Sequence, residues 1–159
     1  MKRVNGWRPP RWFRVWMICA TRGGDGWLWY TMGLALLLFG GMHGVHAVLT
    51  AAAAAGTGVG LFIGLKRTFR RRRPMVFESH CWATLLPPDQ FSFPSGHSIT
   101  AFSVAVSLSH YYPSLMAGLM FCALSIAISR IVLGMHFLSD VVAGSLLGAL
   151  LGYAAYTVL

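Results

Sequence analysis

A stretch of 39 residues, 27–65, contains no Lys, Arg, Asp or Glu. One transmembrane helix needs about 20 apolar residues, so this stretch predicts two consecutive membrane-spanning helices with a turn near residues 40–46 (GGMHGVH). Charged residues make up 11% of the chain, whereas soluble domains carry about a quarter. A water-soluble fold would lack the polar surface that it needs, and we therefore expect an integral membrane protein.

Three further apolar segments follow a polar stretch at residues 66–97, and they lie at residues 96–112, 114–133 and 138–159. Residues 1–26 alternate basic and aromatic side chains, which is typical of a segment at the membrane interface. The sequence therefore predicts an all-α, polytopic helical bundle with about five transmembrane helices. It forms a single domain, 1–159, with an interfacial arm at 1–26 and an active-face loop at 66–97.

Two of the apolar segments carry glycines at four-residue spacing. This spacing gives a helix a narrow face that a second helix can approach closely. The two predicted faces are formed by Gly56, Gly60 and Gly64, and by Gly144, Gly148 and Gly152. The later face suits packing within one chain or between chains, so the oligomeric state stays open.

The order of the crossings predicts where the polar residues meet. Two crossings separate the loop 66–97 from the break at 130–137, so both are expected on the same membrane face. His43, His46 and His110 lie near the turns on the opposite face, and we interpret them as interfacial residues. Within the loop, a stretch that includes Glu78, His80, Trp82, Asp89 and Gln90 is expected to shape the entry of a headgroup.

The first polar cluster is basic and runs from Lys66 to Arg73, directly before Pro74. Lys66 and Arg73 are seven residues apart, so a continuing helix would place both on one side, two turns apart. Taken alone, the cluster is best interpreted as a positive cytoplasmic flank that fixes topology. Phosphate binding is the alternative, because Arg offers a planar fork for phosphate oxygens and Lys a point charge.

The second cluster is the turn Pro94-Ser95-Gly96-His97. Glycine lets backbone N–H groups approach an anion, and the start of a helix adds its positive dipole end. The alternative is that Ser95 caps the third predicted helix while His97 is a bystander at the interface. Taken alone, the turn favours neither interpretation.

The third cluster contains Arg130, His136 and Asp140. His136 and Asp140 are four residues apart, so they share a helical face within reach of a carboxylate–imidazole hydrogen bond. Such a carboxylate fixes the tautomer of the ring and stabilises its cationic form. Ionisable residues next to apolar spans are costly and are usually functional, so the three together indicate a functional site.

These three clusters, in this order and with this internal spacing, resemble the signature of the type-2 phosphatidic acid phosphatase superfamily. Its parts are Lys-x6-Arg-Pro, Pro-Ser-Gly-His and Ser-Arg-x5-His-x3-Asp, which here cover residues 66–140, about half of the chain. The superfamily includes membrane lipid phosphatases, glucose-6-phosphatase and soluble vanadium haloperoxidases. Its membrane members commonly have six spans, one more than this sequence predicts.

The resemblance implies a two-step hydrolysis without a metal or other cofactor. His136 would attack phosphorus and form a phosphohistidine, Asp140 would orient and charge its ring, and His97 would protonate the leaving group. Five groups would hold the phosphate oxygens, namely Lys66, Arg73, Ser95, Gly96 and Arg130. Positioning and charge stabilisation dominate phosphoryl transfer, which agrees with this residue set.

The expected partners are a lipid phosphate substrate and the bilayer. Candidate substrates are polyprenyl diphosphate, phosphatidic acid, phosphatidylglycerol phosphate and the lipid A phosphate. The alternative is a non-catalytic membrane protein whose basic face binds anionic lipid, which leaves the spacing of the histidines as a coincidence. A haloperoxidase is disfavoured because those relatives are soluble. Nucleic-acid binding is disfavoured because a membrane interface explains the net charge of +9 better.

The membrane side of the site is left open by two conflicting indications. The predicted crossings place all 13 Lys and Arg residues on the face of the site, and the positive-inside rule favours the cytoplasm for that face. Lipid phosphatases of the resembling family usually act on the outer face. We expect an integral protein of a bacterial inner (plasma) membrane, with the charge bias favouring a cytoplasmic site.

Overall fold

A computed structural model describes residues 10–74 and 90–159 of the chain. Within these two ranges the elements are helices and no strand forms, apart from one isolated bridge between Arg72 and Phe91. The predicted all-α membrane bundle is therefore confirmed. The expected headgroup-entry stretch with Glu78, His80, Trp82 and Asp89 lies outside the described residues, as do the first nine residues of the arm.

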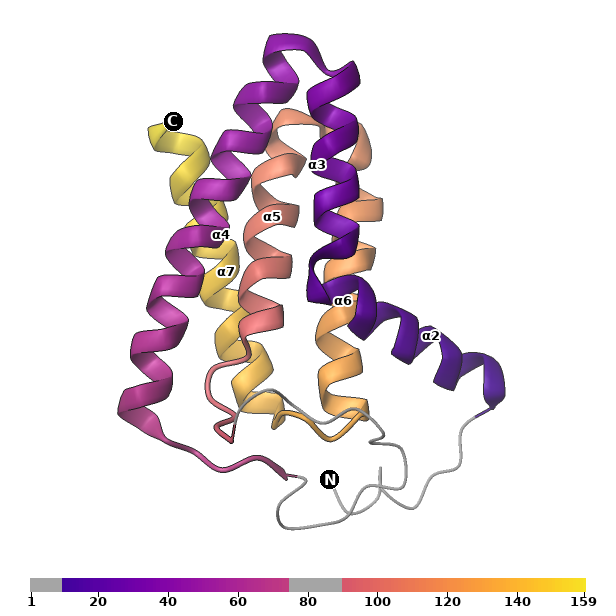
Figure 1. The fold of residues 1–159 in the computed structure, drawn as a ribbon, viewed down its shortest axis with the longest axis vertical. Helices are drawn as coiled ribbons and strands as arrows, with labels where there is room; N and C mark the ends of the chain where they lie inside the picture. Colours follow the sequence, from indigo (N-terminus) through magenta and orange to yellow (C-terminus); the bar gives the residue numbers. More distant parts are fainter. Residues whose placement is uncertain (1–9, 75–89) are drawn as a thin grey trace.

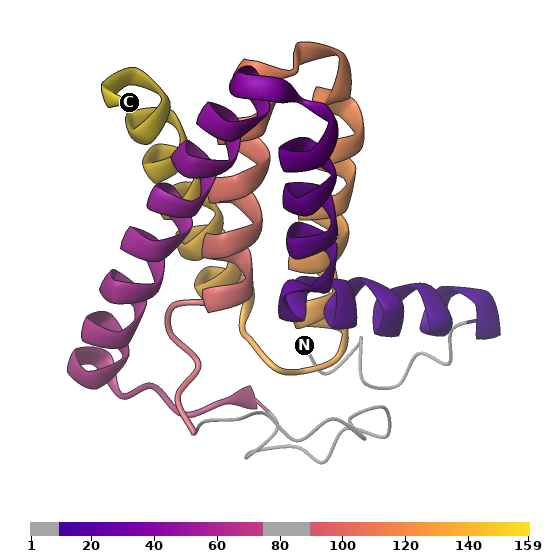
Figure 2. The same cartoon turned by 45° about the horizontal axis from the view of Figure 1, so that its top comes forward.

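The N-terminal part of the chain folds as two helices that meet at a kink. Helix α2 (Arg11–Arg22) and helix α3 (Leu28–Phe39) are joined by the π-helical segment η1 (Gly23–Trp27), in which Gly26 has a φ of 122°. In Figure 2, α2 lies across one end of the bundle, at a large angle to the other helices. It buries Met17 and exposes Trp12, as expected of a helix at an interface.

Helix α4 (Gly41–Phe69) follows α3 after a single residue, Gly40. The turn predicted at residues 40–46 is therefore shorter than expected, and His43 and His46 lie in the first two turns of α4. Glycine is required at the join, since a Cβ at Gly44 would meet the carbonyl oxygen of Leu36. The two helices can thus turn back on each other without a loop.

The second half of the chain contains α5 (Gly96–Tyr111), the 3₁₀ turn η3 (Pro113–Leu115), α6 (Met116–Val132) and α7 (Leu138–Val158). Helix α5 lies in the middle of the bundle and packs against α4, α6 and α7 (Figure 1). Its contact surface is built from small buried residues, among them Ala101 and Ala105, which permits close approach of the neighbouring helices.

The two predicted glycine faces have different outcomes. On α7, a Cβ at Gly144, Gly148 or Gly152 would meet the backbone of α5, so this face packs within the chain. On α4, a Cβ at Gly56, Gly60 or Gly64 would have no heavy atom within 4 Å. The prediction for α4 is therefore wrong within the described residues, and the close contact there is made by Gly58 against Ile99.

The five predicted apolar segments each contain one helix, in the predicted order. Of the helices in the described residues, three are long and apolar enough to cross a membrane, and they are α4, η3 with α6, and α7. Helix α3 has 12 residues and α5 has 16, which is shorter than the length expected for a span. The α3–α4 and α5–η3 turns lie at one end of the bundle in Figure 1, and the α6–α7 connection lies at the other.

Candidate active site

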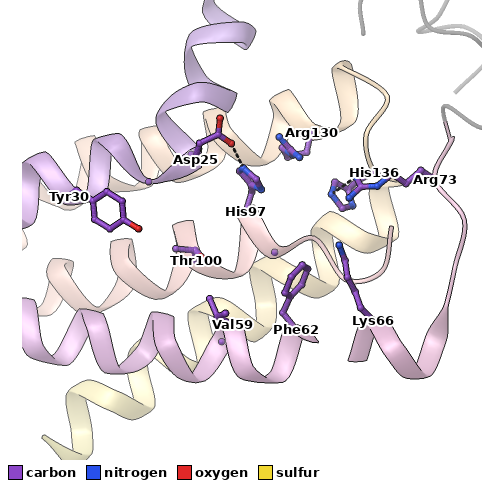
Figure 3. A pocket seen from close by; sticks show the side chains of 14 residues that line it. Asp25, Tyr30, Val59, Phe62, Lys66, Arg73, His97, Thr100, Arg130 and His136 are labelled. Carbon is purple, nitrogen blue, oxygen red and sulfur yellow. Dashed lines mark hydrogen bonds and ion pairs between the residues drawn. The ribbon is translucent and has the colours of Figure 1, made fainter. Parts of the chain in front are cut away.

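A cavity of about 360 Å³ opens at the end of the bundle where α2 crosses it. It is enclosed by η1, α3, α4, the segment after α4, α5, α6 and the α6–α7 connection. Figure 3 shows its polar side chains converging from these separate elements. The lining residues are Gly24, Asp25, Gly26, Tyr30, Gly58, Val59, Phe62, Lys66, Arg73, Gly96, His97, Thr100, Arg130 and His136.

Six of the eight residues singled out in the sequence line this cavity, and they are Lys66, Arg73, Gly96, His97, Arg130 and His136. The other two, Ser95 and Asp140, are fully buried behind the wall. Residues from three distant parts of the chain are thus brought together at one end of the bundle. This is the arrangement that the order of crossings predicts.

His136 lies in the connection between α6 and α7 and is 2% exposed. The connection is held by two backbone hydrogen bonds, in which Met135 N and His136 N both donate to the carbonyl oxygen of Arg130 at 3.0 and 3.1 Å. Nδ1 of the ring lies 2.6 Å from the carbonyl oxygen of Ser92. A carbonyl only accepts, so Nδ1 carries the proton and Nε2 keeps its lone pair.

The hydrogen bond predicted between His136 and Asp140 is not formed. Asp140 Oδ2 lies 3.9 Å from Nδ1 of His136, which is longer than a hydrogen bond. That oxygen instead accepts from the backbone N–H of Phe137 at 2.9 Å. The prediction is wrong because the carbonyl of Ser92 occupies Nδ1, so Asp140 acts on the ring as a nearby negative charge.

Burial lowers the pKa of His136 to about 4, and the positive charges of Arg73 and Arg130 act in the same direction. The carboxylate of Asp140 opposes this shift. The ring is therefore neutral at physiological pH. A neutral imidazole that keeps its lone pair on Nε2 is the form that a nucleophile requires.

Three buried cationic side chains surround His136. Arg73 donates from Nη1 to the carbonyl oxygen of Met135 at 2.8 Å, and the same atom lies 3.2 Å from Nε2 of His136. Arg130 donates to the hydroxyl of Thr21 on α2, and Lys66 lies over the ring of Phe62 at 4.3 Å. Three positive charges converge on one cavity, and Arg and Lys side chains both bind phosphate oxygens, so this set favours an anionic ligand.

Lys66 and Arg73 reach the cavity from two different elements. Helix α4 ends at Phe69, and Arg70 adopts the left-handed conformation with a φ of 43°. The helix therefore does not continue to Arg73, and Lys66 and Arg73 do not share one helical side. Lys66 points into the cavity from the last turn of α4, and Arg73 enters from the non-helical segment that follows (Figure 3).

The turn before α5 shows the capping arrangement. Ser95 Oγ accepts a hydrogen bond from the hydroxyl of Ser98 at 2.9 Å and from its backbone N–H at 3.4 Å. Its own backbone N–H donates to the carbonyl oxygen of Asp140 at 3.0 Å, which ties α5 to α7. Gly96 faces the cavity, where a Cβ would come within 2.8 Å of the ring of Phe62.

Arg71, one of the arginines beyond the three-part motif, contacts the buried carboxylate behind His136. Its Nη1 atom lies 2.8 Å from Asp140 Oδ1 and 2.8 Å from the hydroxyl of Ser139. Its guanidinium also lies over the ring of Phe137 at 4.2 Å. Arg71 therefore fixes the carboxylate that stabilises the ring of His136.

Two further residues at the site were missed in the sequence. Ser92 contributes a backbone carbonyl, which no side-chain pattern reveals. Asp25 Oδ1 lies 2.8 Å from Nε2 of His97, although its segment reads only as a glycine-rich break. The sequence did offer one indication of a role for Asp25, because acidic residues are scarce: Asp and Glu together number four in the whole chain.

An apolar groove of about 440 Å³ adjoins the cavity between α3, α4 and α5. The two spaces share four lining residues, namely Gly26, Tyr30, Val59 and Thr100. Apart from Trp29, the groove is otherwise lined by small and aliphatic side chains, among them Gly33, Leu34 and Ala52. A polar pocket thus continues directly into a space suited to hydrocarbon.

Comparison with known proteins agrees with this geometry. Residues 45–159 match the sequence model of the PAP2 superfamily. Lipid A 1-phosphatase of Rhizobium johnstonii is 30% identical over 147 residues, which cover 80% of this chain and 59% of that protein. The chain therefore spans about three fifths of the length of this relative.

Two crystal structures are also similar over 98% of this chain. Aquifex aeolicus LpxE has a TM-score of 0.82 and 30% identity, with 92% of its chain covered. The PAP2-type phosphatidylglycerolphosphate phosphatase of Bacillus subtilis has a TM-score of 0.73 and 27% identity, with 80% covered. The sequence match takes in α5, α6, α7 and most of α4, which hold the residues around His136. The chain therefore belongs to the PAP2 superfamily.

Proposed function

We propose that the protein is an integral membrane phosphatase that hydrolyses a phosphate monoester or diphosphate of a membrane lipid through a phosphohistidine. The observation that carries the proposal is the environment of His136. Its Nδ1 is held by the carbonyl of Ser92, and its Nε2 lies beside Arg73 in a cavity lined by three buried cations. A phosphate held by these cations would lie next to a nucleophilic nitrogen.

The proposed reaction has two steps. In the first, the lone pair of His136 Nε2 bonds to phosphorus, the bond from phosphorus to the leaving oxygen breaks, and His97 gives that oxygen a proton. In the second, water attacks phosphorus, His97 takes a proton from the water, and the N–P bond breaks to release inorganic phosphate. Lys66, Arg73 and Arg130 stabilise the charge on the phosphoryl oxygens throughout.

The apolar groove supports a lipid as the substrate. A phosphate in the cavity would have its hydrocarbon chain beside α3 and α4, where exposed Leu34, Leu37 and Val59 offer apolar surface. By their names, the relatives act on lipid A 1-phosphate and phosphatidylglycerol phosphate. These two, together with phosphatidic acid and polyprenyl diphosphate, form the substrate panel.

The test is phosphate release from this panel by the detergent-purified protein, with and without a chelator. We expect release that the chelator leaves unchanged and that His136→Ala lowers by roughly 10³-fold or more, as for loss of a covalent nucleophile. His110→Ala is the matched control, because His110 stacks on Tyr156 at a centroid distance of 4.5 Å and does not line the cavity.

Three outcomes would contradict the proposal. Metal-dependent release would overturn the mechanism, and undiminished release by His136→Ala would overturn the assignment of the nucleophile. Binding of anionic lipid that survives loss of His97 and His136, with no turnover of any phosphate ester, would favour a non-catalytic lipid-binding protein.

A further inference from the structure

The only carboxylate among the described residues that line the cavity belongs to Asp25. Its Oδ1 lies 2.8 Å from Nε2 of His97. Figure 3 shows the His97 ring with Asp25 on one side and His136 on the other. The side chain of His97 is 23% exposed and that of Asp25 is 45% exposed, so the contact lies in the wall of the cavity.

The presence of a carboxylate in a cavity that would hold phosphate requires a physical explanation. A pocket that holds a phosphate would be expected to exclude carboxylates, because like charges repel. Burial disfavours a positive charge on His97, and Arg130 and Arg73, which line the same cavity, act in the same direction. A carboxylate hydrogen-bonded to the ring opposes that effect and favours the imidazolium, the form that can give up a proton.

The glycines on either side of Asp25 allow its carboxylate to lie next to His97. Gly24 packs so closely that a Cβ there would come within 3.1 Å of His97 Cδ2 and 2.8 Å of Ile126 Cγ2. Gly26 has a φ of 122°, which favours glycine strongly over residues with a side chain. The kink between α2 and α3 therefore places the carboxylate within hydrogen-bond distance of the imidazole.

We propose that Asp25 is a positioning residue that orients His97 and favours its protonated form for proton transfer to the leaving group. The inference rests on the proposed function, since it assigns the source of the acid in the first step. With the Nε2 proton held by Asp25, the proton on Nδ1 is the one that passes to the leaving oxygen as the P–O bond breaks. Asp25 keeps its negative charge throughout.

This role extends the site beyond the residues that match the sequence model of the family. The match begins at residue 45, whereas Asp25 lies in η1. Arg130 is likewise held by Thr21 of α2. The N-terminal segment thus supplies groups that orient both the acid and a phosphate-binding cation.

The test compares two phosphate esters that differ in their need for an acid. Decyl phosphate releases an alkoxide unless it is protonated, whereas 4-nitrophenyl phosphate releases a stable anion. General acid catalysis contributes about 10²–10⁴-fold, and we expect Asp25→Asn to lower kcat for decyl phosphate by about 10- to 100-fold. The loss on 4-nitrophenyl phosphate should be several times smaller. Asp25→Glu, which keeps the charge, should recover part of the activity on decyl phosphate.

Alanine substitutions at two neighbouring glycines provide a second test and a matched control. Gly24→Ala places a methyl group against His97 and should reproduce the selective loss on decyl phosphate. At Gly23 a Cβ would meet only Leu28 Cβ, at an ordinary 3.7 Å, and its backbone is helical. Gly23→Ala should therefore leave both activities unchanged. Thermal unfolding in detergent should show that Asp25→Asn retains the fold.

The outcomes separate this inference from the proposed function. Absence of turnover by the wild-type protein on every phosphate ester would refute the proposed function itself. Wild-type turnover combined with equal losses of Asp25→Asn on both esters would make Asp25 merely structural. Full activity of Asp25→Asn on decyl phosphate would likewise overturn the inference, and the function would stand.

Discussion

At the scale of single residues, the site depends on what holds each side chain rather than on the side chains alone. His136 is fixed at Nδ1 by a backbone carbonyl, and Asp140 is fixed by Arg71 and the N–H of Phe137. These partners decide the tautomer and charge of the groups that would do the chemistry.

The protonation of His136 can be measured directly. Its lowered pKa, about 4, results from burial and from nearby Arg73 and Arg130. A lowered pKa means that the ring stays neutral as the pH falls through the ordinary value of about 6.5 and takes up a proton only near pH 4. Nitrogen NMR of ¹⁵N-histidine-labelled protein, assigned with His136→Gln, should show this low midpoint. A midpoint at or above 6.5 would contradict the expected environment.

The contact of Arg71 with Asp140 predicts a role for an arginine outside the motif. Arg71 is partly exposed, so its ion pair is screened by solvent and is worth roughly 1 kcal/mol or less. Arg71→Ala should therefore lower kcat by several-fold, up to about tenfold, while KM changes little. Arg70→Ala is the matched control, since the Arg70 side chain donates from Nε to the backbone carbonyl of Arg67 at 3.1 Å and does not line the cavity. Equal effects of the two variants would refute the role.

At the scale of elements, the bundle is held by close helix contacts that only small residues allow. Helix α7 lies against α5 through Gly144, Gly148 and Gly152. This contact places Asp140, in the first turn of α7, next to the turn that begins α5. The close approach of α7 to α5 therefore sets the position of Asp140 in the site.

Two glycine substitutions measure this dependence. A Cβ at Gly148 would meet the carbonyl of Ile99, whereas a Cβ at Gly60 would meet nothing within 4 Å. Forcing α7 away from α5 is expected to cost about 1–3 kcal/mol, so Gly148→Ala should lower the Tm in detergent by several degrees and reduce activity. Gly60→Ala should leave both nearly unchanged. Equal Tm values would show that the helices are not in close contact.

At the scale of the whole molecule, the sequence predicts the order of the helices better than it predicts the individual contacts within the site. Long apolar runs are local features, so the order of the helices and the end at which the polar clusters meet were both predictable. The carbonyl of Ser92 and the carboxylate of Asp25 were not, because their positions depend on how irregular segments pack. The end of α4 at Phe69 also escaped prediction, since a non-glycine residue, Arg70, adopts the left-handed conformation there.

The orientation in the membrane is testable at this scale. All 13 Lys and Arg residues are expected on the face of the site, and the positive-inside rule favours the cytoplasm for that face. In a variant whose cysteines are replaced, an impermeant maleimide should label Ser114→Cys in intact cells. It should label Arg70→Cys only after permeabilisation. The reverse pattern would place the site on the outer face.

The continuity of the cavity with the apolar groove has a kinetic consequence. A lipid substrate whose chain occupied the groove between α3 and α4 would reach His136 by diffusing within the bilayer, without entering the aqueous phase. The rate would then follow the mole fraction of the lipid in the membrane or micelle, so that adding inert detergent at constant substrate concentration would slow the reaction by surface dilution.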